Sequence, residues 1–431
     1  MIRLTAQERE ILAGREGPFR QKALEFIVRY AEVLGAEELC RISRATLFIG
    51  AQHYLDVYPQ DEDYRKIFSQ FYLNSEEILD FGTVDPGCKA QTCAGCCEWD
   101  GLEAAHGDPQ RYQRNQIYME AAKKMGISIV DSCTPYYEGW IPMMGEHFVS
   151  TESSNVVLSN SLFGGYGTSD GVEAAVCAAI SGRIPRWGMH IPENRFGTCV
   201  VHVQARIETQ CDWDVLGYTL GRMMPKGSIP VVVGAGETLE INGMRQFCAA
   251  VSVLSNTELC HILGYTPEAR TLEMALGGKT PAYEITIGEA DIQQSRDMLC
   301  DAGEGPVGLV FLGCPHVALD ELKEFACYLQ GKHVAPGSEL QIWTDCGTKE
   351  KAKRSGYLSA IEQAGGNVLV GSCPVVMGKE SISHAKSLVM YGAKQAHTIR
   401  HQAQVPVYYG CLLYTSPSPR DMRRSRMPSS A

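Results

Sequence analysis

The sequence predicts an α/β protein built on parallel sheets with helical cover. The clearest sign is the alternation after residue 306, where the apolar runs VGLVFLG, ELQIWT and NVLVG are separated by two amphipathic helices, 318–331 and 349–365. Parallel neighbours need a crossover connection, usually a helix, so this βαβαβ order indicates a parallel sheet. A length of 431 residues and a hydrophobic content of 45% suffice for two or three domains with large cores.

The rest of the chain carries the same kinds of element at less regular spacing. The expected helices lie at 19–35, 108–126, 170–182 and 242–255, and the expected strands at 44–50, 127–131, 198–207 and 229–236. We expect an α/β region over 1–290, made of two intertwined subdomains, and a further α/β domain over 291–410.

The last segment, 411–431, does not share these patterns. It has no apolar periodicity, and it carries four arginines against one aspartate. It resembles a translated sequencing-adaptor read-through, so we expect a non-native, disordered tail.

Charge and hydropathy exclude several classes of function. The formal net charge is −11, which disfavours a nucleic-acid partner. No apolar run reaches the roughly 18 residues that a membrane span needs. The N-terminal residues carry charges where a secretory signal has its apolar core, so we expect a cytoplasmic protein.

Several of the 17 cysteines follow the ends of predicted strands. Cys133, Cys314, Cys346 and Cys373 all stand just past such runs. Ligands of parallel α/β sheets bind beyond the carboxyl ends of the strands, so these thiols are expected near one another. Gathered thiolates need a cation, either zinc or an iron–sulfur cluster. Chance placement in a cysteine-rich chain is the alternative that the spacing alone leaves open.

A second cysteine pattern competes with the first. The run CKAQTCAGCC contains Cys88, Cys93 and Cys96 in the C-x4-C-x2-C spacing of plant-type ferredoxins. It raises an alternative of another class, a non-catalytic iron–sulfur electron-transfer protein. A zinc-stabilised binding subunit is a further alternative that does not depend on this run. A cysteine-rich surface turn is the plainer interpretation of this run.

Five sequence blocks, taken in order, resemble a known family. DSCTPYY, TESSNVVLSNSLFG, HIPENR, LGCPHVALDELKE and GSCPVV are similar to the signature blocks of the aconitase X family large subunit, and the late YGAKQAH is similar to another. The similarity runs from about residue 1 to residue 410.

The resemblance implies a hydro-lyase with aconitase-like three-layer α/β/α domains and a cluster site at the strand carboxyl ends between domains. It implies an iron–sulfur cluster, [4Fe-4S] or [2Fe-2S], held by Cys133, Cys314 and Cys373. Three protein ligands leave one iron open to act as a Lewis acid, whereas four would allow only redox work. Cys346 and the 88–97 run lie outside the family pattern.

The resemblance also implies the residues that meet the substrate. The expected substrate-binding residues are Gly50, Ala51, Gln52, Asp85, Pro86, Glu152, Ser153 and Lys394. We expect Glu152, Ser153 and Lys394 to be catalytic, with Lys394 holding a carboxylate or phosphate. His316 is expected either to cap the following helix or to orient a cluster ligand.

Two substrates are known in the family, cis-3-hydroxy-L-proline and mevalonate 5-phosphate. The family's arginine after the TESS block is missing here, where the chain has GGYGTSDGVEAA, and Gly-Ala replaces Asn-Ser before Lys394. Because a phosphate needs cationic groups, cis-3-hydroxy-L-proline is the preferred substrate and mevalonate 5-phosphate the alternative.

The small swivelling domain of the aconitase fold is absent from these blocks. We therefore expect that this domain is a separate small subunit, or that it was lost with a truncated C-terminus. In either case we expect little activity from this chain alone.

Overall fold

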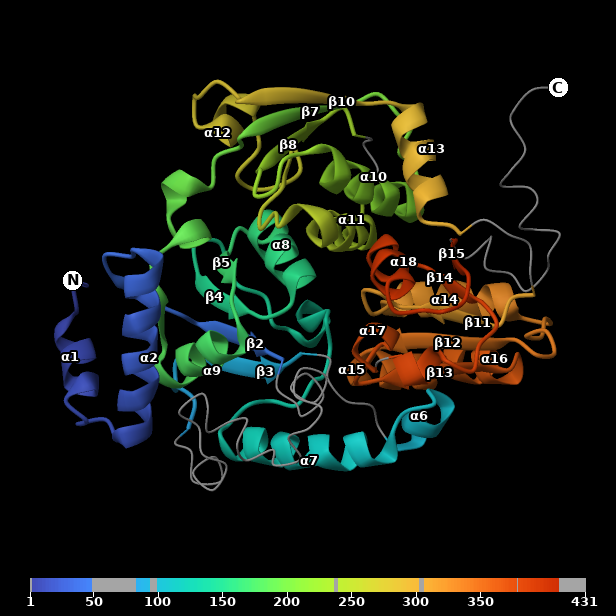
Figure 1. The fold of residues 1–431 in the computed structure, drawn as a ribbon, viewed down its shortest axis with the longest axis horizontal. Helices are drawn as coiled ribbons and strands as arrows, with labels where there is room; N and C mark the ends of the chain where they lie inside the picture. Colours follow the sequence, from blue (N-terminus) through green and yellow to red (C-terminus); the bar gives the residue numbers. More distant parts are fainter. Residues whose placement is uncertain are drawn as a thin grey trace.

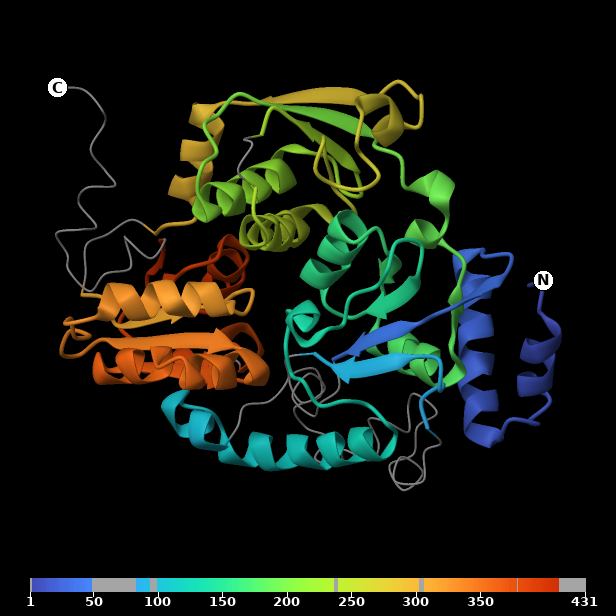
Figure 2. The ribbon, with the colours of Figure 1, turned by 180° about the vertical axis from the view of Figure 1, so that it is seen from behind.

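The computed structural model describes residues 2–48, 83–93, 99–235, 239–301, 306–377 and 379–410. Within these ranges the strands form three parallel sheets and one short antiparallel pair, with helices packed on the sheets (Figures 1 and 2). This arrangement confirms the predicted α/β class. Gly50, Ala51, Gln52, Cys96 and the tail 411–431 lie outside the described residues.

The first sheet has the strand order β3-β2-β4-β5, and all its neighbours are parallel. Its strands are β2 (Arg44–Leu47), β3 (Lys89–Thr92), β4 (His147–Ser150) and β5 (Tyr166–Ser169). Its helices are α1 (Ala6–Leu12), α2 (Pro18–Leu34), α6 (Trp99–Ala104), α7 (Pro109–Lys124), α8 (Ser153–Leu162) and α9 (Val172–Ser181). The antiparallel pair is β1 (Leu39–Arg41) with β6 (Arg183–Pro185), and the 3-10 turns are η1 (Pro135–Glu138), η2 (Gly188–His190) and η3 (Pro192–Asn194). Alanines of α9 allow α2 to pack closely in this core.

The second sheet has the order β10-β7-β8-β9, again all parallel. Its strands are β7 (Cys199–Val203), β8 (Pro230–Val233), β9 (His261–Ile262) and β10 (Tyr283–Ile287). Its helices are α10 (Gln210–Met223), α11 (Ile241–Ser255), α12 (Leu272–Leu276) and α13 (Glu289–Met298). Thr209 and Asp212 form a capping box that starts α10, with the Asp212 amide donating to Thr209 Oγ1 over 3.2 Å.

The third sheet has the order β13-β12-β11-β14-β15, all parallel. Its strands are β11 (Leu309–Leu312), β12 (Glu339–Thr344), β13 (Gly366–Val370), β14 (Leu388–Met390) and β15 (Val407–Tyr409). Its helices are α14 (Leu319–Leu329), α15 (Cys346–Arg354), α16 (Tyr357–Gln363), α17 (Pro374–Met377), η4 (Lys379–Ile382) and α18 (Ala393–Arg400). The helices α14, α15 and α16 share one core with the sheet, and α6 and α18 share the other.

Two expected elements differ from the structure. Residues 127–131 form no extended strand; the structure has a single parallel bridge between Gln91 and Ser128, because Asp131 turns into the left-handed region with a φ of 50°. The helix expected over 349–365 is two helices, α15 and α16, separated at Gly356, whose φ of 79° no right-handed helix allows. The predicted boundary at residue 290 stays a prediction; the three sheets occupy 44–169, 199–287 and 309–409.

Helix α11 lies at the centre of the molecule and is buried on nearly all sides (Figure 1). It packs on α10 of its own sheet, on α8 of the first sheet and on α18 of the third. A helix buried all round needs apolar or small residues on every face, and FCAAVSV within α11 supplies them. The helices α8 and α18 are therefore both positioned by packing against α11.

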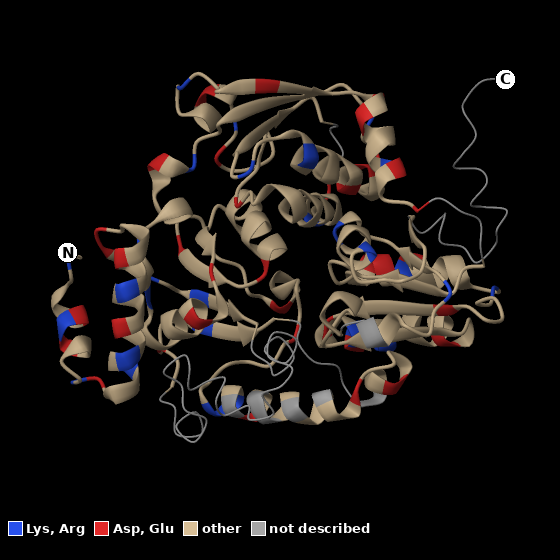
Figure 3. Cartoon of the chain, viewed as in Figure 1, with Lys and Arg blue, Asp and Glu red and all other residues tan. Residues whose placement is uncertain are grey.

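The described helices bear acidic and basic side chains interspersed, as along α2 and α13 (Figure 3). None of the helices in the described ranges has the length and apolar character that crossing a membrane requires.

Replacing Gly217 by alanine should destabilise the contact between α10 and α11. A Cβ at this position would lie 2.5 Å from the Phe247 carbonyl oxygen, so the helices would have to move apart. We expect a loss of about 1–3 kcal/mol, measured as a lower midpoint in urea unfolding. Gly288→Ala is the matched control, since its added Cβ meets nothing closer than 3.9 Å. Equal midpoints for the two variants would contradict this account of the packing.

Candidate active site at two facing sheet edges

The carboxyl edge of the first sheet carries two of the predicted site residues. Glu152 and Ser153 follow β4, and Cys93 follows β3, on the other side of β2. The segment after β2 begins at the same edge, where the Phe48 amide donates to Thr151 Oγ1 over 2.8 Å. Because parallel strands all end at the same edge of a sheet, these residues lie together at the carboxyl edge.

The carboxyl edge of the third sheet carries the other predicted residues. Cys314 follows β11, and Lys394 follows its neighbour β14. Cys373 follows β13, which is separated from β11 by β12. Gly392 brings the start of α18 close to the Cys314 loop, because an added Cβ there would lie 2.1 Å from the Cys314 carbonyl oxygen. The close backbone contact at this point therefore requires the glycine of the Gly-Ala pair that precedes Lys394 in this chain.

Lys394 and Glu152 join the two edges. Lys394 Nζ donates to Glu152 Oε1 over 2.6 Å and to Ser153 Oγ over 3.2 Å. Burial opposes charge on Lys394, but the Glu152 carboxylate outweighs it and the pKa of Lys394 is raised. Burial likewise acts to raise the pKa of Glu152, but Lys394 and the hydrogen bonds from Ser154 outweigh it, so the pKa is lowered. The pair is thus ionised, and both side chains keep about a fifth of their surface exposed, 19% and 21%.

Cys133, Cys314 and Cys373 lie close enough to influence one another. Burial raises the pKa of Cys133 to about 12 and that of Cys373 to about 11, and Glu152 adds to both shifts. Burial also raises the pKa of Cys314 well above its usual value, and the other two thiols add to it. Lys394 acts in the opposite direction on all three. The structure therefore gathers the three predicted ligands beside the Glu152–Lys394 pair.

His316 connects the three loops that carry these thiols. Its backbone amide donates to Cys133 Sγ over 3.3 Å, and its ring Nε2 lies 2.8 Å from the Ser372 carbonyl oxygen. Because that oxygen only accepts, Nε2 carries the proton, and Nδ1 accepts from the Ser132 hydroxyl at 3.2 Å. Burial lowers the pKa of His316, so the ring is neutral. Of the two expected roles, these contacts favour orienting a ligand over capping a helix.

A buried ion pair fixes the loop after Cys314 from the other side. Arg245 of α11 contacts Glu321 of α14 over 2.5 Å and also donates to the His316 carbonyl oxygen. Glu321 in turn accepts from the Ala318 amide over 2.7 Å, which starts α14. Removing one partner of such a pair costs about 3–5 kcal/mol, because the other charge is left buried.

The three thiols suit an iron–sulfur cluster better than one zinc ion. The three sulfur atoms are not all within 4.8 Å of one another. Sulfur ligands of one tetrahedral zinc lie about 3.8 Å apart, given Zn–S bonds of about 2.3 Å, whereas the cysteines of a cluster bind different irons. The buried Ser372 hydroxyl beside Cys373 has no hydrogen-bond partner, a donor that a bound group would satisfy.

Two other predictions are not brought to this place. Asp85 and Pro86 precede β3 and so lie at its amino end; the Asp85 carboxylate contacts Arg20 and, over 3.6 Å, Arg41. Cys88 and Cys93 stand at opposite ends of β3, about 16 Å apart at about 3.3 Å per residue. That separation is too great for two ligands of one cluster, so it disfavours the electron-transfer alternative.

The sequence analysis did not place Cys93 and Asp345 at the site. Cys93 Sγ lies 4.0 Å from Glu152 Oε2, at the carboxyl end of a strand too short to stand out by periodicity. Asp345 follows β12 and caps α15 by accepting from the Thr348 amide over 2.7 Å. Aspartate is a common N-cap residue, so Asp345 in the sequence DCGT could have marked the start of this helix.

Comparison with known families identifies the chain. Its sequence matches the models for the first, second and third domains of aconitase X over residues 1–193, 197–297 and 307–413. The chain belongs to the aconitase X family. The resemblance noted in the sequence is thereby confirmed.

Curated relatives and a solved structure agree with this assignment. The phosphomevalonate dehydratase large subunit of Thermococcus kodakarensis is 29% identical over 86% of this chain and 89% of its own, and that of Methanocaldococcus jannaschii is 28% identical over 89% and 92%. The cis-3-hydroxy-L-proline dehydratase of Pseudomonas aeruginosa is 26% identical over 92% of this chain and 66% of its own. The holo-form crystal structure of Thermococcus kodakaraensis aconitase X matches with a TM-score of 0.79, at 26% identity over 99% of this chain and 100% of that chain.

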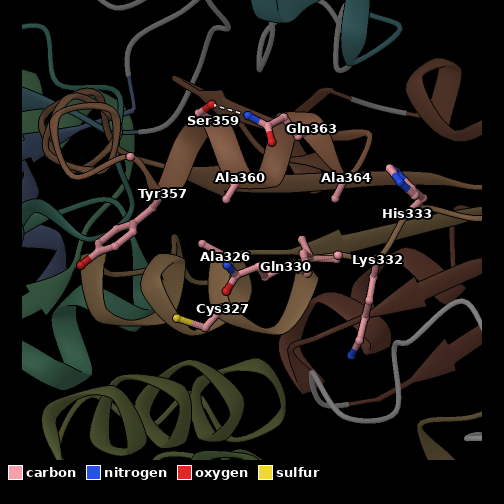
Figure 4. Close-up of a pocket in the computed structure, with 13 residues that line it drawn as sticks. Ala326, Cys327, Gln330, Lys332, His333, Tyr357, Ser359, Ala360, Gln363 and Ala364 are labelled. Atoms are coloured by element: carbon pink, nitrogen blue, oxygen red, sulfur yellow. Dashed lines mark hydrogen bonds between the residues drawn. The ribbon is translucent and has the colours of Figure 1, made fainter.

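A hollow of about 510 Å³ lies elsewhere, between α14 and α16 on the outer side of the third sheet (Figure 4). It is lined by residues within 326–333 and 356–364, and it includes none of the candidate site residues. The exposed Cys327 borders it, so this thiol is apart from the three at the sheet edge.

Serine at any one of the three gathered cysteines should remove the cluster. We expect Cys133→Ser, Cys314→Ser and Cys373→Ser to lose most of the bound iron and the brown colour after anaerobic preparation. Cys88→Ser and Cys346→Ser are the matched controls and should keep both. Loss of iron in Cys88→Ser alone would instead support the ferredoxin-like run.

His316→Ala should weaken cluster binding although His316 is not a proposed ligand. It removes the ring that holds Ser132 and Ser372, so two of the three thiol loops lose a common anchor. Contacts of this kind typically change metal affinity by about 10–100-fold. The measurement is iron retained during chelator challenge, with the exposed His333→Ala as control and His316→Gln as the conservative variant. Identical retention in all three would remove this role from His316.

Proposed function

We propose that this chain is the large subunit of a dehydratase that removes water from a small hydroxy acid. The observation that carries the proposal is the ionised Glu152–Lys394 pair beside three gathered thiols. A hydro-lyase needs a proton acceptor, a donor for the substrate's carboxylate and help for the departing hydroxyl. These groups offer all three at one place.

In this proposal Cys133, Cys314 and Cys373 hold an iron–sulfur cluster. When bound, the cluster supplies a Lewis acid for the departing hydroxyl group. The His316 amide, which donates to Cys133 Sγ over 3.3 Å, stabilises thiolate charge on that ligand.

Glu152 is assigned as the proton acceptor. Its lowered pKa keeps the carboxylate unprotonated near neutral pH, and its Oε2 faces away from Lys394, toward Cys93. Its place at the N-cap of α8, where it accepts from the Ser154 amide over 3.3 Å, fixes the carboxylate's position.

Lys394 is assigned as the donor to the substrate's carboxylate. An ammonium group has three N–H donors, and Glu152 and Ser153 take two of them. The third is available at the exposed part of the side chain. Ser153 Oγ holds the ammonium in place and adds a hydroxyl donor at the same edge.

Among substrates, cis-3-hydroxy-L-proline is the first candidate. Lys394 is the cation whose charge lowers the pKa of all three thiols, and Glu152 already neutralises it. Among the described residues, this one neutralised cation suits one carboxylate better than a carboxylate with a phosphate. Mevalonate 5-phosphate is the second candidate, because the chain spans 89–92% of the two phosphomevalonate large subunits named above but 66% of the hydroxyproline enzyme.

The relatives' description as large subunits supports a small-subunit partner for this chain. In the proposal that partner closes over the site, so the chain alone has little activity. Full activity of the purified chain without any partner would refute this part.

Lys394→Met should lower kcat/KM by about 10²–10³-fold while the cluster stays bound. The assay uses the cluster-loaded chain with its small subunit and follows dehydration of each candidate substrate, and the iron content is measured in parallel. Lys386→Met, which changes an exposed lysine, is the control. Undiminished activity of Lys394→Met would contradict the assignment, and turnover of mevalonate 5-phosphate alone would reverse the order of substrates.

A further inference from the structure

Two histidines and a glutamate from distant segments converge at the amino end of β12. His106 Nε2 lies 3.0 Å and 3.2 Å from the two carboxylate oxygens of Glu339, and His384 Nε2 lies 3.3 Å from one of them. The two imidazole rings stack with centroids 3.7 Å apart. One ligand atom from each residue falls within 4.8 Å of the other two.

The backbone at His106 is held in an unusual conformation that presents its ring to Glu339. His106 has a φ of 53°, in the left-handed region that residues other than glycine seldom adopt. The next residue is tightly packed, since a Cβ on Gly107 would lie 2.2 Å from Leu102 Cδ1 and 2.8 Å from Met377 Cε. His106 is the left-handed residue that ends α6, with the Gly107 amide donating to the Leu102 carbonyl oxygen over 2.8 Å, and this helix end fixes where its ring begins.

All three side chains are reachable from solvent. His106, Glu339 and His384 are 39%, 36% and 32% exposed. Without an ion, an Nε2–H of each ring faces the Glu339 carboxylate, which can only accept. A cation at this place takes over the carboxylate, and moving the ring proton to Nδ1 frees the Nε2 lone pair for the cation.

We propose that His106, Glu339 and His384 form a binding site for one divalent first-row transition ion, with zinc preferred. Two imidazole nitrogens and a carboxylate are a known zinc ligand set, and three protein ligands leave a position for water. Magnesium and calcium prefer all-oxygen sites, so the two imidazoles disfavour them. The ion connects His106, in the loop between α6 and α7, to the third sheet.

This site is separate from the three thiols. Glu339 begins β12, whereas Thr344 at the other end leads to the carboxyl edge, about 17 Å away for a strand of this length. Among the described residues a second group, Cys40, His147 and His190, also brings ligand atoms within 4.8 Å. There the two Nδ1 atoms are 3.0 Å apart and hydrogen-bond to each other, His190 and Cys40 are buried, and the group has no carboxylate to balance the charge of a cation.

Zinc titration of the cluster-loaded chain, after alkylation of its accessible thiols, tests the proposal. We expect one zinc per chain whose affinity falls at least ~100-fold in both His106→Gln and His384→Gln. His202→Gln is the matched control, because His202 pairs with Glu284 over 2.9 Å without a second imidazole. Unchanged binding in both variants, or loss of the zinc in Cys40→Ser instead, overturns the proposal.

A second measurement does not depend on how well the variants fold. Co²⁺ bound to the alkylated wild-type chain should show visible ligand-field bands without thiolate charge-transfer absorption. A strong charge-transfer band at one equivalent would place the ion on cysteine and overturn the proposal. Circular dichroism of the metal-free variants should match the wild type, and Glu339→Gln should weaken Co²⁺ binding as the histidine variants do.

Discussion

The candidate site depends on the neutral ring of His316, which is buried between the loop that carries Cys133 and the loop that carries Cys373. One nitrogen donates to the backbone beside Cys373, the other accepts from the serine beside Cys133, and the residue itself follows Cys314. A charged or differently protonated ring could not make both contacts, since one requires a donor and the other an acceptor. Burial keeps the ring neutral, and so the same environment that hides His316 also sets its hydrogen-bonding pattern.

Helix α11 links the surroundings of His316 to helices of all three sheets. The helices α8 and α18, whose first turns carry Ser153 and Lys394, both pack against α11. Arg245 of α11 also donates a hydrogen bond to the carbonyl oxygen of His316. At Gly217 the backbone of α10 lies so close to α11 that α11 cannot move further toward α10. The Lys394–Glu152 ion pair then closes the gap between the first and third sheets. Its strength depends on partial burial, because an exposed pair of the same length would contribute little.

Relatives in the family are named for different substrates, and Gly392, a departure of this chain from the family pattern, lies beside the gathered residues. Its missing Cβ is what lets the Cys314 carbonyl approach α18. The neutralised charge of Lys394 is another constraint on what binds there. Under the proposed function, specificity would therefore rest on backbone packing and charge balance as well as on the side chains that face the substrate.

Local patterns in the sequence were sufficient for the fold class and for the family. Alternating apolar strands and amphipathic helices predict parallel sheets. The rule that ligands meet strand carboxyl ends selected Cys133, Cys314, Cys346 and Cys373 from 17 cysteines, and the family resemblance then set Cys346 aside. The tertiary structure decided the rest: the partner of Lys394 lies 242 residues away along the chain, and the ring of His316 reaches a serine 184 residues away. Such contacts depend on how helices pack across three sheets, and a sequence period of two or 3.6 residues carries no record of that. For the same reason Asp85 was expected at the site and lies at the opposite end of its strand, while Cys93 was set aside and lies beside Glu152.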